Sequence, residues 1–362
     1  MKIVVIGTRG IPNILGGVET HCEELYPRIV AMGHDVTIVR RTPYVEANNK
    51  ISEYKGVKLI DVYAPRKKSV EAIIHTFLAV IKARGLKPDV LHVHAIGPAI
   101  MVPFARLIGM KVVMTNHGPD YDRQKWGRLA KFVLKAGEYL GTKFSNRVIV
   151  ISNVIANILK TRYNRCDTDL IFNGVNKPKK SANVDFLQSK GILPGKYILA
   201  LGRFVKEKGF HDLIEAYKRL GDCGYQLVIA GDADHEDEYS RTLKKQAADV
   251  GVILTGFIKG ENLNQIMSNA ALFAMPSYHE GLPIALLEAM SYNIDALVSD
   301  IPANILPCLC PLDYFKVGEV EDLSVRLTDK LSQLQLQRQY DLADYNWDKI
   351  AEQTIEVYKS TK

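Results

Sequence analysis

The chain has 362 residues, of which 47% are hydrophobic and 24% charged, and its formal net charge is +7. This length exceeds what one hydrophobic core usually supports, so we expect two domains of a globular enzyme. The charge permits an anionic partner, whether nucleotide, membrane surface or nucleic acid, without selecting one. No apolar run has the roughly 18 to 20 residues of a membrane-spanning helix, and the start MKIVVIGTRG is typical of a strand, not of a signal peptide. We therefore expect a cytoplasmic protein.

The first half of the chain alternates short β-branched runs with helix-length amphipathic segments. The expected strands are 2–8, 35–41, 57–63, 89–95, 111–117 and 147–152. Because this alternation is typical of βαβ units, it predicts an α/β fold with a doubly wound parallel sheet, covered by helices on both faces.

The loop 7–20 follows the first expected strand and has Gly16-Gly17 directly before a helix. Paired glycines let the backbone approach a ligand closely, and a helix N-terminus presents N–H groups to an anion. A plain loop-to-helix turn would have the same sequence, so the pair by itself leaves both interpretations open.

A dinucleotide-binding enzyme is one alternative for this loop. Gly7 and Gly10 do not complete the G-x-G-x-x-G fingerprint. The second expected strand ends in Arg40-Arg41, where an NAD enzyme has an acidic residue. An NADP enzyme could use these arginines, so that alternative is weakened but stays open.

Three histidines stand near the ends of expected strands. His92 and His94 are two residues apart and share one face of their strand, and His117 ends the next strand, beside a glycine. A single histidine in a strand is usually a core or edge residue. At a carboxyl end, His117 is better placed to contact a ligand.

The segment 121–147 carries seven cations against two acidic residues. On a helix, Lys125, Arg128, Lys131 and Lys135 lie on one side, and the apolar residues lie roughly opposite. This pattern fits a helix packed on the core with a solvated basic face. It fits equally well a peripheral contact of 123–147 with an anionic membrane.

The pattern breaks at 173–196, which is rich in Lys, Pro, Gly and Asn, as an interdomain connection would be. A second series of expected strands follows at 197–203, 226–232, 252–257, 271–277 and 295–300. We therefore expect two doubly wound domains. Because such sheets bind ligands at the carboxyl ends of their strands, a cleft between the domains is the expected site.

Two motifs in the second half carry charges beside expected strand ends. LGRFVKEKGF places Arg203 and Lys208 where they could hold a diphosphate, although a solvated basic loop fits equally well. SYHEGLPIALLEAM places Glu280 before a helix whose first turn should contain Pro283, and Glu288 inside that helix. Both carboxylates could reach one elongated ligand.

Metal-binding patterns are weak in this sequence. Asp232 and Asp234 form a D-x-D in a hydrophilic loop, and Cys308 and Cys310 have no second cysteine pair. We therefore expect no metal ion and no other cofactor.

The ordered set GGVET, NHG, ISN, NGV, GR-x4-KG and HEG-x-P-x4-E resembles the retaining glycosyltransferases of family 4 over nearly the whole chain. This resemblance implies the GT-B fold, with an acceptor-side domain at 1–173 and a donor-binding domain at 174–345. It also implies that a C-terminal helix, 346–362, crosses back to the first domain. The opening IGTRGIPNILGGVET is similar to bacterial enzymes that build capsule, O-antigen and exopolysaccharide.

The resemblance also implies roles for single residues. Glu288 would bind the ribose, Arg203 and Lys208 the diphosphate, and Glu280 the donor sugar. His117 would lie near the C6 region of the donor and the reacting centre. The implied donor-binding residues are Gly16, Gly17, Arg203, Lys208, Glu280, Gly281, Leu282, Pro283 and Glu288, and the implied catalytic residues are His117, Glu280, Arg203 and Lys208.

These observations predict a transferase that moves a sugar from a UDP-, GDP- or dTDP-sugar to a saccharide acceptor carried on a lipid at the inner face of the plasma membrane. No nucleic-acid partner is expected. A sugar-nucleotide epimerase, an NADP-dependent oxidoreductase and a catalytically silent binding protein remain alternatives. The sequence names neither the base, the sugar nor the acceptor.

Overall fold

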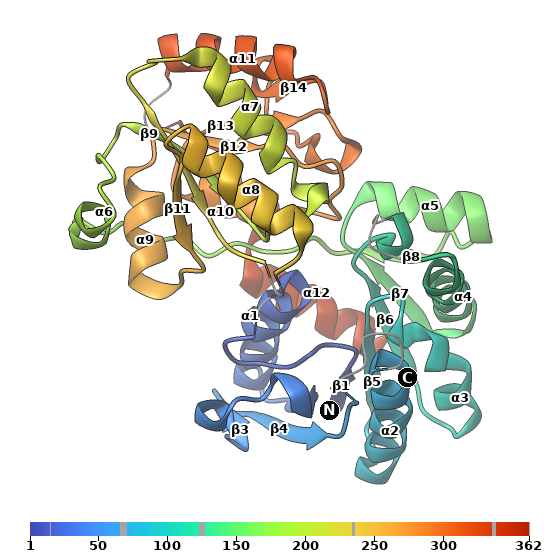
Figure 1. The fold of residues 1–362 in the computed structure, drawn as a ribbon. Coiled ribbons are helices and arrows are strands. Elements are labelled where there is room, and N and C mark those ends of the chain that lie inside the picture. The colour runs from blue at the N-terminus through green and yellow to red at the C-terminus, as the bar shows by residue number, and fades with distance from the viewer. Residues whose placement is uncertain (15, 66–70, 123–126, 234–235, 335–337, 362) are drawn as a thin grey trace. The chain divides into compact units, whose positions relative to one another are not determined.

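The computed structural model describes residues 1–14, 16–65, 71–122, 127–233, 236–334 and 338–361. The chain forms two compact units (Figure 1). Unit 1 comprises Met1–Gly174 together with Asp344–Lys362, and unit 2 comprises Val175–Ala343. The sequence places the corresponding boundary between residues 173 and 174, and the start of the returning helix at residue 346.

Unit 1 contains one sheet of eight strands in the order β3-β4-β2-β1-β5-β6-β7-β8. All neighbours are parallel except β3 and β4. The strands are β1 (Lys2–Ile6), β2 (Asp35–Arg41), β3 (Glu53–Tyr54), β4 (Val57–Val62), β5 (Val90–His94), β6 (Val112–Asn116), β7 (Arg147–Val150) and β8 (Thr168–Leu170). The six strands expected from the sequence are confirmed, and β3 and β8 are additional.

The helices of unit 1 cover both faces of this sheet. They are α1 (Gly17–Ala31), α2 (Glu71–Leu86), α3 (Val102–Leu107), α4 (Arg128–Phe144), α5 (Asn153–Tyr163) and α12 (Trp347–Lys359). Short 3-10 helices lie at η1 (Thr42–Tyr44), η2 (Ala47–Asn49), η3 (Pro98–Met101) and η4 (Asp120–Asp122), and η8 (Ala343–Tyr345) spans the boundary between the units.

The alternation of side chains along β1 divides the core of unit 1 in two. Ile3 and Val5 belong to the cluster that contains α1 and α12, whereas Val4 and Ile6 belong to the cluster that contains α2 and α3. Because both faces are buried, the strand is a continuous apolar run. The last helix, α12, begins after Asn346, whose side chain accepts hydrogen bonds from the N–H groups of Asp348 and Lys349.

Unit 2 contains a parallel sheet of six strands in the order β11-β10-β9-β12-β13-β14. The strands are β9 (Tyr197–Leu201), β10 (Gln226–Ala230), β11 (Ile253–Gly256), β12 (Leu272–Met275), β13 (Asp295–Ser299) and β14 (Tyr314–Phe315). The helices are α6 (Asp185–Ser189), η5 (Lys206–Lys208), α7 (Phe210–Leu220), α8 (Glu238–Asp249), α9 (Gly260–Asn269), α10 (Ile284–Ser291), η6 (Pro302–Asn304), η7 (Pro311–Asp313) and α11 (Val320–Ser332).

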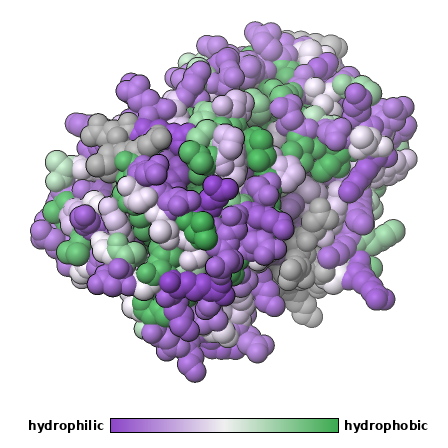
Figure 2. Space-filling model, turned by 90° about the horizontal axis from the view of Figure 1, so that it is seen from above, coloured by the Kyte–Doolittle hydropathy of each residue, from purple (hydrophilic) through white to green (hydrophobic). Residues whose placement is uncertain are grey.

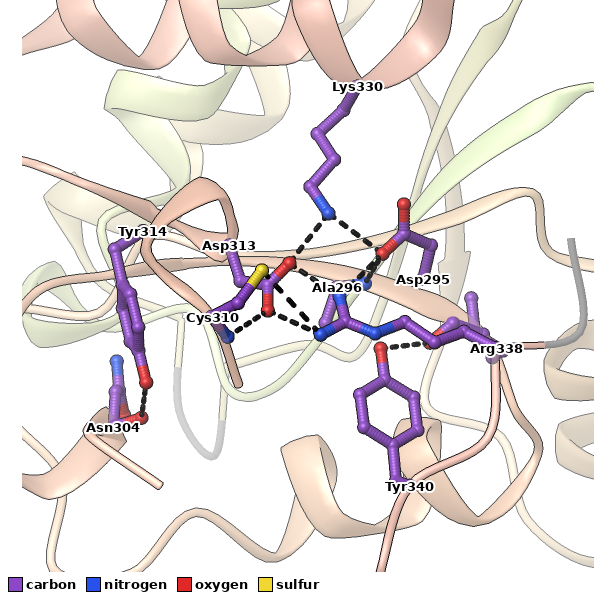
Figure 3. Close-up of polar contacts among 10 residues, drawn as sticks. Asp295, Ala296, Asn304, Cys310, Asp313, Tyr314, Lys330, Arg338 and Tyr340 are labelled. Atoms are coloured by element: carbon purple, nitrogen blue, oxygen red, sulfur yellow. Dashed lines mark hydrogen bonds and ion pairs between the residues drawn. The ribbon is translucent and has the colours of Figure 1, made fainter. Parts of the chain in front are cut away.

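A buried ion network joins several of these elements (Figure 3). Lys330 Nζ lies 2.8 Å from Asp295 Oδ1 and 2.7 Å from Asp313 Oδ1, and Arg338 Nη2 lies 2.7 Å from Asp313 Oδ2. Burial opposes ionisation of Asp313, but the hydrogen bonds from Arg338 and Lys330 outweigh it, so the pKa of this carboxyl is lowered. Two cations and two carboxylates therefore fasten β13, η7 and α11 together.

The face of the molecule in Figure 2 is mostly hydrophilic, with hydrophobic residues visible between the polar ones. Among the described residues, α4 carries two of the most exposed apolar side chains, Leu129 at 78% and Phe132 at 69%. Within the described ranges, no helix combines the length and the apolar character needed to cross a membrane.

Candidate functional site

The charged motifs of unit 2 meet at the carboxyl ends of β9 and β12. Lys208 Nζ donates to Glu280 Oε1 over 2.6 Å, and the hydroxyl of Ser277 donates to the same oxygen over 2.7 Å. The side chains of Lys208 and Glu280 are 20% and 12% exposed, so the ion pair is only partly open to solvent. Two predicted site residues that are 72 positions apart in the sequence are thus in direct contact.

The backbone of two loops holds this pair in place. Gly209 has a φ of 66°, and a Cβ atom there would lie 2.0 Å from the carbonyl oxygen of Pro276. Only glycine therefore allows the loop after β9 to pass so close to the loop after β12. The N–H of Tyr278 donates to the carbonyl of Glu207 over 2.8 Å and joins the same two loops.

The helix after Glu280 begins one residue later than the sequence predicts. Pro283 is the N-cap of α10 and not part of its first turn. Its carbonyl accepts hydrogen bonds from the N–H groups of Leu286 and Leu287, while its own φ and ψ are extended. Gly281 and Leu282 precede this cap, and Glu288 lies in α10 with a partly exposed side chain.

Arg203 lies two residues past the end of β9, in the same loop as Lys208, and its side chain is partly exposed. It is therefore at the sheet edge where ligands of such folds bind. Its predicted contact with a diphosphate stays a prediction.

The predicted histidines of unit 1 belong to a larger cluster, in which His92 and His94 are buried and His117 is partly exposed. His94 Nδ1 and His117 Nε2 are 2.9 Å apart, and the rings of His92 and His94 stack with their centroids 4.2 Å apart. The shared face of His92 and His94 is thus confirmed. His21 of α1 was not predicted, and its ring centroid lies 5.1 Å from that of His117. Because α1 follows β1, its first turns start at the carboxyl edge of the sheet. That position in the sequence could have indicated His21 as a site residue.

Burial keeps these imidazoles uncharged at neutral pH. It lowers the pKa of His21 to about 4 and that of His92 to about 3, and it lowers those of His94 and His117 well below the usual value. Neighbouring imidazoles add to this effect for His92, His94 and His117. His117 can therefore act as a neutral hydrogen-bonding group.

The predicted glycine pair lies at the start of α1, which begins at Gly17 after the N-cap Gly16. A Cβ atom on Gly16 would lie 2.0 Å from Glu19 Oε2, so the carboxylate packs directly against this glycine. Glu19 also accepts hydrogen bonds from the hydroxyl of Thr8 and the N–H of Arg9. The close approach at Gly16 thus serves Glu19, and an approach of a donor to Gly16-Gly17 stays a prediction.

The two arginines at the end of β2 do not favour the NADP alternative. Arg40 is 1% exposed, and its guanidinium binds Asp61 and backbone carbonyls, including that of Ile51. Arg41 forms an ion pair with Glu71 over 3.1 Å. Both cations are therefore committed to partners within the protein.

Among the described residues, neither the acidic motif nor the cysteine motif belongs to a group with the spacing of metal ligands. Asp232 pairs with Lys244 over 3.0 Å, whereas Asp234 lies outside the described residues. Cys308 and Cys310 are free thiols. In the described part of the chain, the group with a spacing suited to a metal ion is His21, His94 and His117.

Two protein-family models match the chain. The model described as Glycosyltransferase Family 4 matches residues 15–177, and the model described as Glycosyl transferases group 1 matches residues 186–306. Together they span more than half of the chain, and each lies almost entirely within one half of the fold.

Two relatives illustrate the similarity in sequence. An uncharacterized glycosyltransferase of Methanocaldococcus jannaschii is 26% identical, over 99% of this chain and 98% of its own. A putative teichuronic acid biosynthesis glycosyltransferase of Bacillus subtilis, TuaC, is 25% identical, over 78% of this chain and 76% of its own.

Two solved structures illustrate the similarity in fold. Sucrose-phosphate synthase from Thermosynechococcus elongatus has a TM-score of 0.82 at 20% identity, covering 99% of this chain and 98% of its own. The HepE protein of Anabaena, solved in complex with UDP, has a TM-score of 0.77 at 17% identity, covering 99% of this chain and 100% of its own. The chain belongs to glycosyltransferase family 4 and is a glycosyltransferase with the GT-B fold.

Proposed function

We propose that this enzyme is a retaining glycosyltransferase that moves a sugar from a nucleotide sugar to a saccharide acceptor in bacterial surface polysaccharide synthesis. The observation that carries the proposal is the contact of Lys208 with Glu280 at the carboxyl ends of β9 and β12. The assignment of the Bacillus relative to teichuronic acid biosynthesis supports a role in polysaccharide synthesis. The complexes of the Anabaena protein with UDP and with UDP-glucose support a nucleotide-sugar donor.

The proposed chemistry at unit 2 begins with the departing phosphate, on which negative charge develops as the glycosidic bond breaks. Lys208 and Arg203, both in the loop after β9, would neutralise this charge without a metal ion. Lys208 is held by Glu280 in the structure, so the donor diphosphate would share or replace this carboxylate as its partner. One such donor group typically contributes about 3 to 4 kcal/mol to transition-state stabilisation.

The remaining residues are assigned to successive parts of the nucleotide sugar, from the ribose to the transferred sugar. Glu288 in α10 would accept hydrogen bonds from the ribose hydroxyls, and Glu280 would do so from the hydroxyls of the sugar. Backbone N–H groups of Gly281 and Leu282 would assist; Pro283 has none to donate. His117, neutral because partial burial lowers its pKa, would contact the donor near the reacting centre.

A lipid-carried acceptor and a peripheral membrane contact are part of this proposal, and α4 supports them. The helix buries Gly137, Glu138, Gly141 and Thr142, and Leu134 packs against the core of unit 1. Leu129 and Phe132 remain largely exposed, with the cation Lys135 also exposed. An apolar surface beside basic residues suits an anionic membrane, at about 1 kcal/mol for each basic residue. Lys125 and Trp126 of the expected stripe lie outside the described residues.

The test is incubation of the enzyme with a panel of UDP-, GDP- and dTDP-sugars without an acceptor. Slow release of free sugar from one donor class, with the anomeric configuration of the donor kept in the first product, supports the proposal. Interconversion of the sugars without release would instead indicate an epimerase. For the membrane contact, Lys131→Glu with Lys135→Glu should reduce sedimentation with phosphatidylglycerol vesicles but not with phosphatidylcholine vesicles. If the two substitutions leave sedimentation unchanged, the basic side of α4 contacts solvent and not a membrane.

A further inference from the structure

Three imidazoles from separate elements of unit 1 converge at the carboxyl edge of its sheet. His21 lies in the second turn of α1, His94 is the last residue of β5, and His117 directly follows β6. One ligand nitrogen of each lies within 4.8 Å of those of the other two. We propose that these three residues bind one divalent cation of the zinc type, with a fourth coordination position left for water or another oxygen ligand.

The spacing needs only a small adjustment to hold such an ion. Zinc lies about 2.0 to 2.1 Å from imidazole nitrogens, so two nitrogens of one tetrahedral ion are about 3.4 Å apart. His94 Nδ1 and His117 Nε2 are already 2.9 Å apart. The third nitrogen needs a shift of at most about 1.4 Å, given the 4.8 Å limit. Rotation of a histidine side chain provides a shift of this size.

The neighbours of the cluster orient His21 as a metal ligand requires, and they are compatible with the same for His94. Asn173 Oδ1 can only accept, so His21 Nδ1, 3.0 Å away, carries the proton and leaves a lone pair on Nε2. The hydroxyl of Tyr26 contacts His94 Nε2 and His92 Nδ1. When His94 donates through Nε2 to this hydroxyl, its Nδ1 is the nitrogen with a lone pair. Such second partners fix the tautomer and raise the basicity of ligating histidines.

The donor set of the cluster also indicates the kind of metal ion. In the structure, His94 and His117 share one proton between two facing nitrogens. When a cation binds, this proton would move to the other nitrogen of its own ring, so that both imidazoles stay neutral and two coordinate bonds replace the hydrogen bond. Three neutral imidazoles with an open position suit zinc, copper or nickel more than magnesium or calcium.

This cation would tie α1 to β5 and β6 and fix the ring of His117. It is separate from the metal-free neutralisation of the donor diphosphate that we propose for unit 2. Zinc binding and donor hydrolysis are measured independently, so failure of one proposal does not contradict the other.

The test uses full-length protein without an affinity tag, stripped with a chelator and then titrated with Zn²⁺ and with Co²⁺. We expect one equivalent of Zn²⁺ per chain and, for Co²⁺, the visible absorption of a tetrahedral site. His21→Gln and His94→Gln should each abolish this absorption. Asn173→Ala should weaken zinc binding about 10- to 100-fold, because it removes only the orienting partner.

The control is His34→Gln, which removes a histidine before β2 and should bind one equivalent as the wild type does. Circular dichroism and UDP binding verify that each variant is folded. Absence of stoichiometric binding by the wild type, or a cobalt spectrum that survives in His94→Gln, would overturn the proposal. The wild-type titration alone can overturn the proposal, so the test remains valid even when a variant fails to fold.

Discussion

At the scale of single residues, the contact between Lys208 and Glu280 is the feature from which most of the proposed chemistry follows. The ammonium group is partly buried and held at 2.6 Å by one carboxylate oxygen, which also accepts from Ser277. This arrangement keeps a cation at a fixed place on the carboxyl edge of the sheet. A preorganised charge of this kind stabilises a departing phosphate without reorganisation during the reaction.

Replacement of this cation should therefore reduce turnover far more than it reduces stability. We expect Lys208→Ala to lower the rate of donor hydrolysis about 10²- to 10³-fold. The measurement is the initial rate at saturating donor. Lys206→Ala, in the same loop but with an exposed side chain, is the matched control and should keep the wild-type rate. A Lys208→Ala enzyme with nearly normal rates would remove Lys208 from the phosphate site.

His75 offers a prediction on the pH dependence of stability. Burial lowers its pKa from 6.5 to about 4, with a further contribution from Arg41. Between these two pH values the unfolded chain binds a proton that the folded protein does not bind. The free energy of unfolding therefore falls as the pH falls from about 6.5 to about 4, by up to about 1.4 kcal/mol per pH unit for one proton.

The His75→Gln variant should lose stability less steeply over this pH range than the wild type. Both tryptophans, Trp126 and Trp347, lie in the residue ranges of unit 1, so urea unfolding followed by tryptophan fluorescence reports this unit. Equal slopes for the two proteins between pH 6.5 and 4.5 would show that His75 does not titrate as its burial indicates.

At the scale of elements, the packing of α12 depends on Gly174, the last residue of unit 1 before the chain enters unit 2. A Cβ atom on Gly174 would lie 2.5 to 2.8 Å from three ring atoms of Trp347, which is buried in the core shared with α1. The glycine of the NGV motif thus makes room for the first residue of the last helix. The sequence suggested the return of this helix only through the family resemblance.

Gly174→Ala should accordingly overpack this contact and lower the free energy of unfolding of unit 1 by about 1 to 3 kcal/mol. Urea unfolding followed by tryptophan fluorescence measures the change. Gly85→Ala is a suitable control, since a Cβ atom in that turn of α2 meets nothing within 4 Å. It should leave stability unchanged or raise it slightly. An equal effect of both substitutions would exclude the Trp347 contact as the cause.

The buried ion network of unit 2 makes a second prediction at this scale. Among the described residues, Lys330→Met leaves Arg338 as the remaining cation beside the two buried carboxylates, and removal of one partner of a buried ion pair costs about 3 to 5 kcal/mol. Calorimetric unfolding should show a lower transition temperature for unit 2. Lys316→Met removes an exposed cation that pairs with Glu319, and this control should change stability by less than about 1 kcal/mol. A loss of similar size in the control would contradict the role of burial.

At the scale of the whole molecule, the fold was predictable because its signals are local and repeated. Runs such as 2–8 and 226–232 are apolar and bounded by glycine or charge, and they form β1 and β10. The strands β3, β8 and β14 were missed because two or three residues are too few to show a period. Pro283 was placed one residue too far inside its helix, since an N-cap and a first turn differ only in backbone angles.

The site was predictable to a smaller extent. The joint presence of Lys208 and Glu280 could be inferred from the family motifs, whereas their direct contact depends on Gly209 and on the chain path at Pro276. His21 and Asn173, which are 152 positions apart, meet only once β1, α1 and the end of the first half are folded. Long-range contacts of this kind leave no local pattern in a single sequence.

The central claim is that unit 2 binds a nucleotide sugar through Lys208, Glu280 and Glu288. Isothermal titration of the wild type with UDP-, GDP- and dTDP-sugars and with NADPH tests it most directly. We predict saturable binding of one donor class, and about 10- to 100-fold weaker binding by Glu288→Ala, because hydrogen bonds to a charged group contribute about 1.5 to 3 kcal/mol. Glu215→Ala, on the exposed side of α7, is the control and should bind normally. Binding of NADPH with no binding of any nucleotide sugar would contradict the claim.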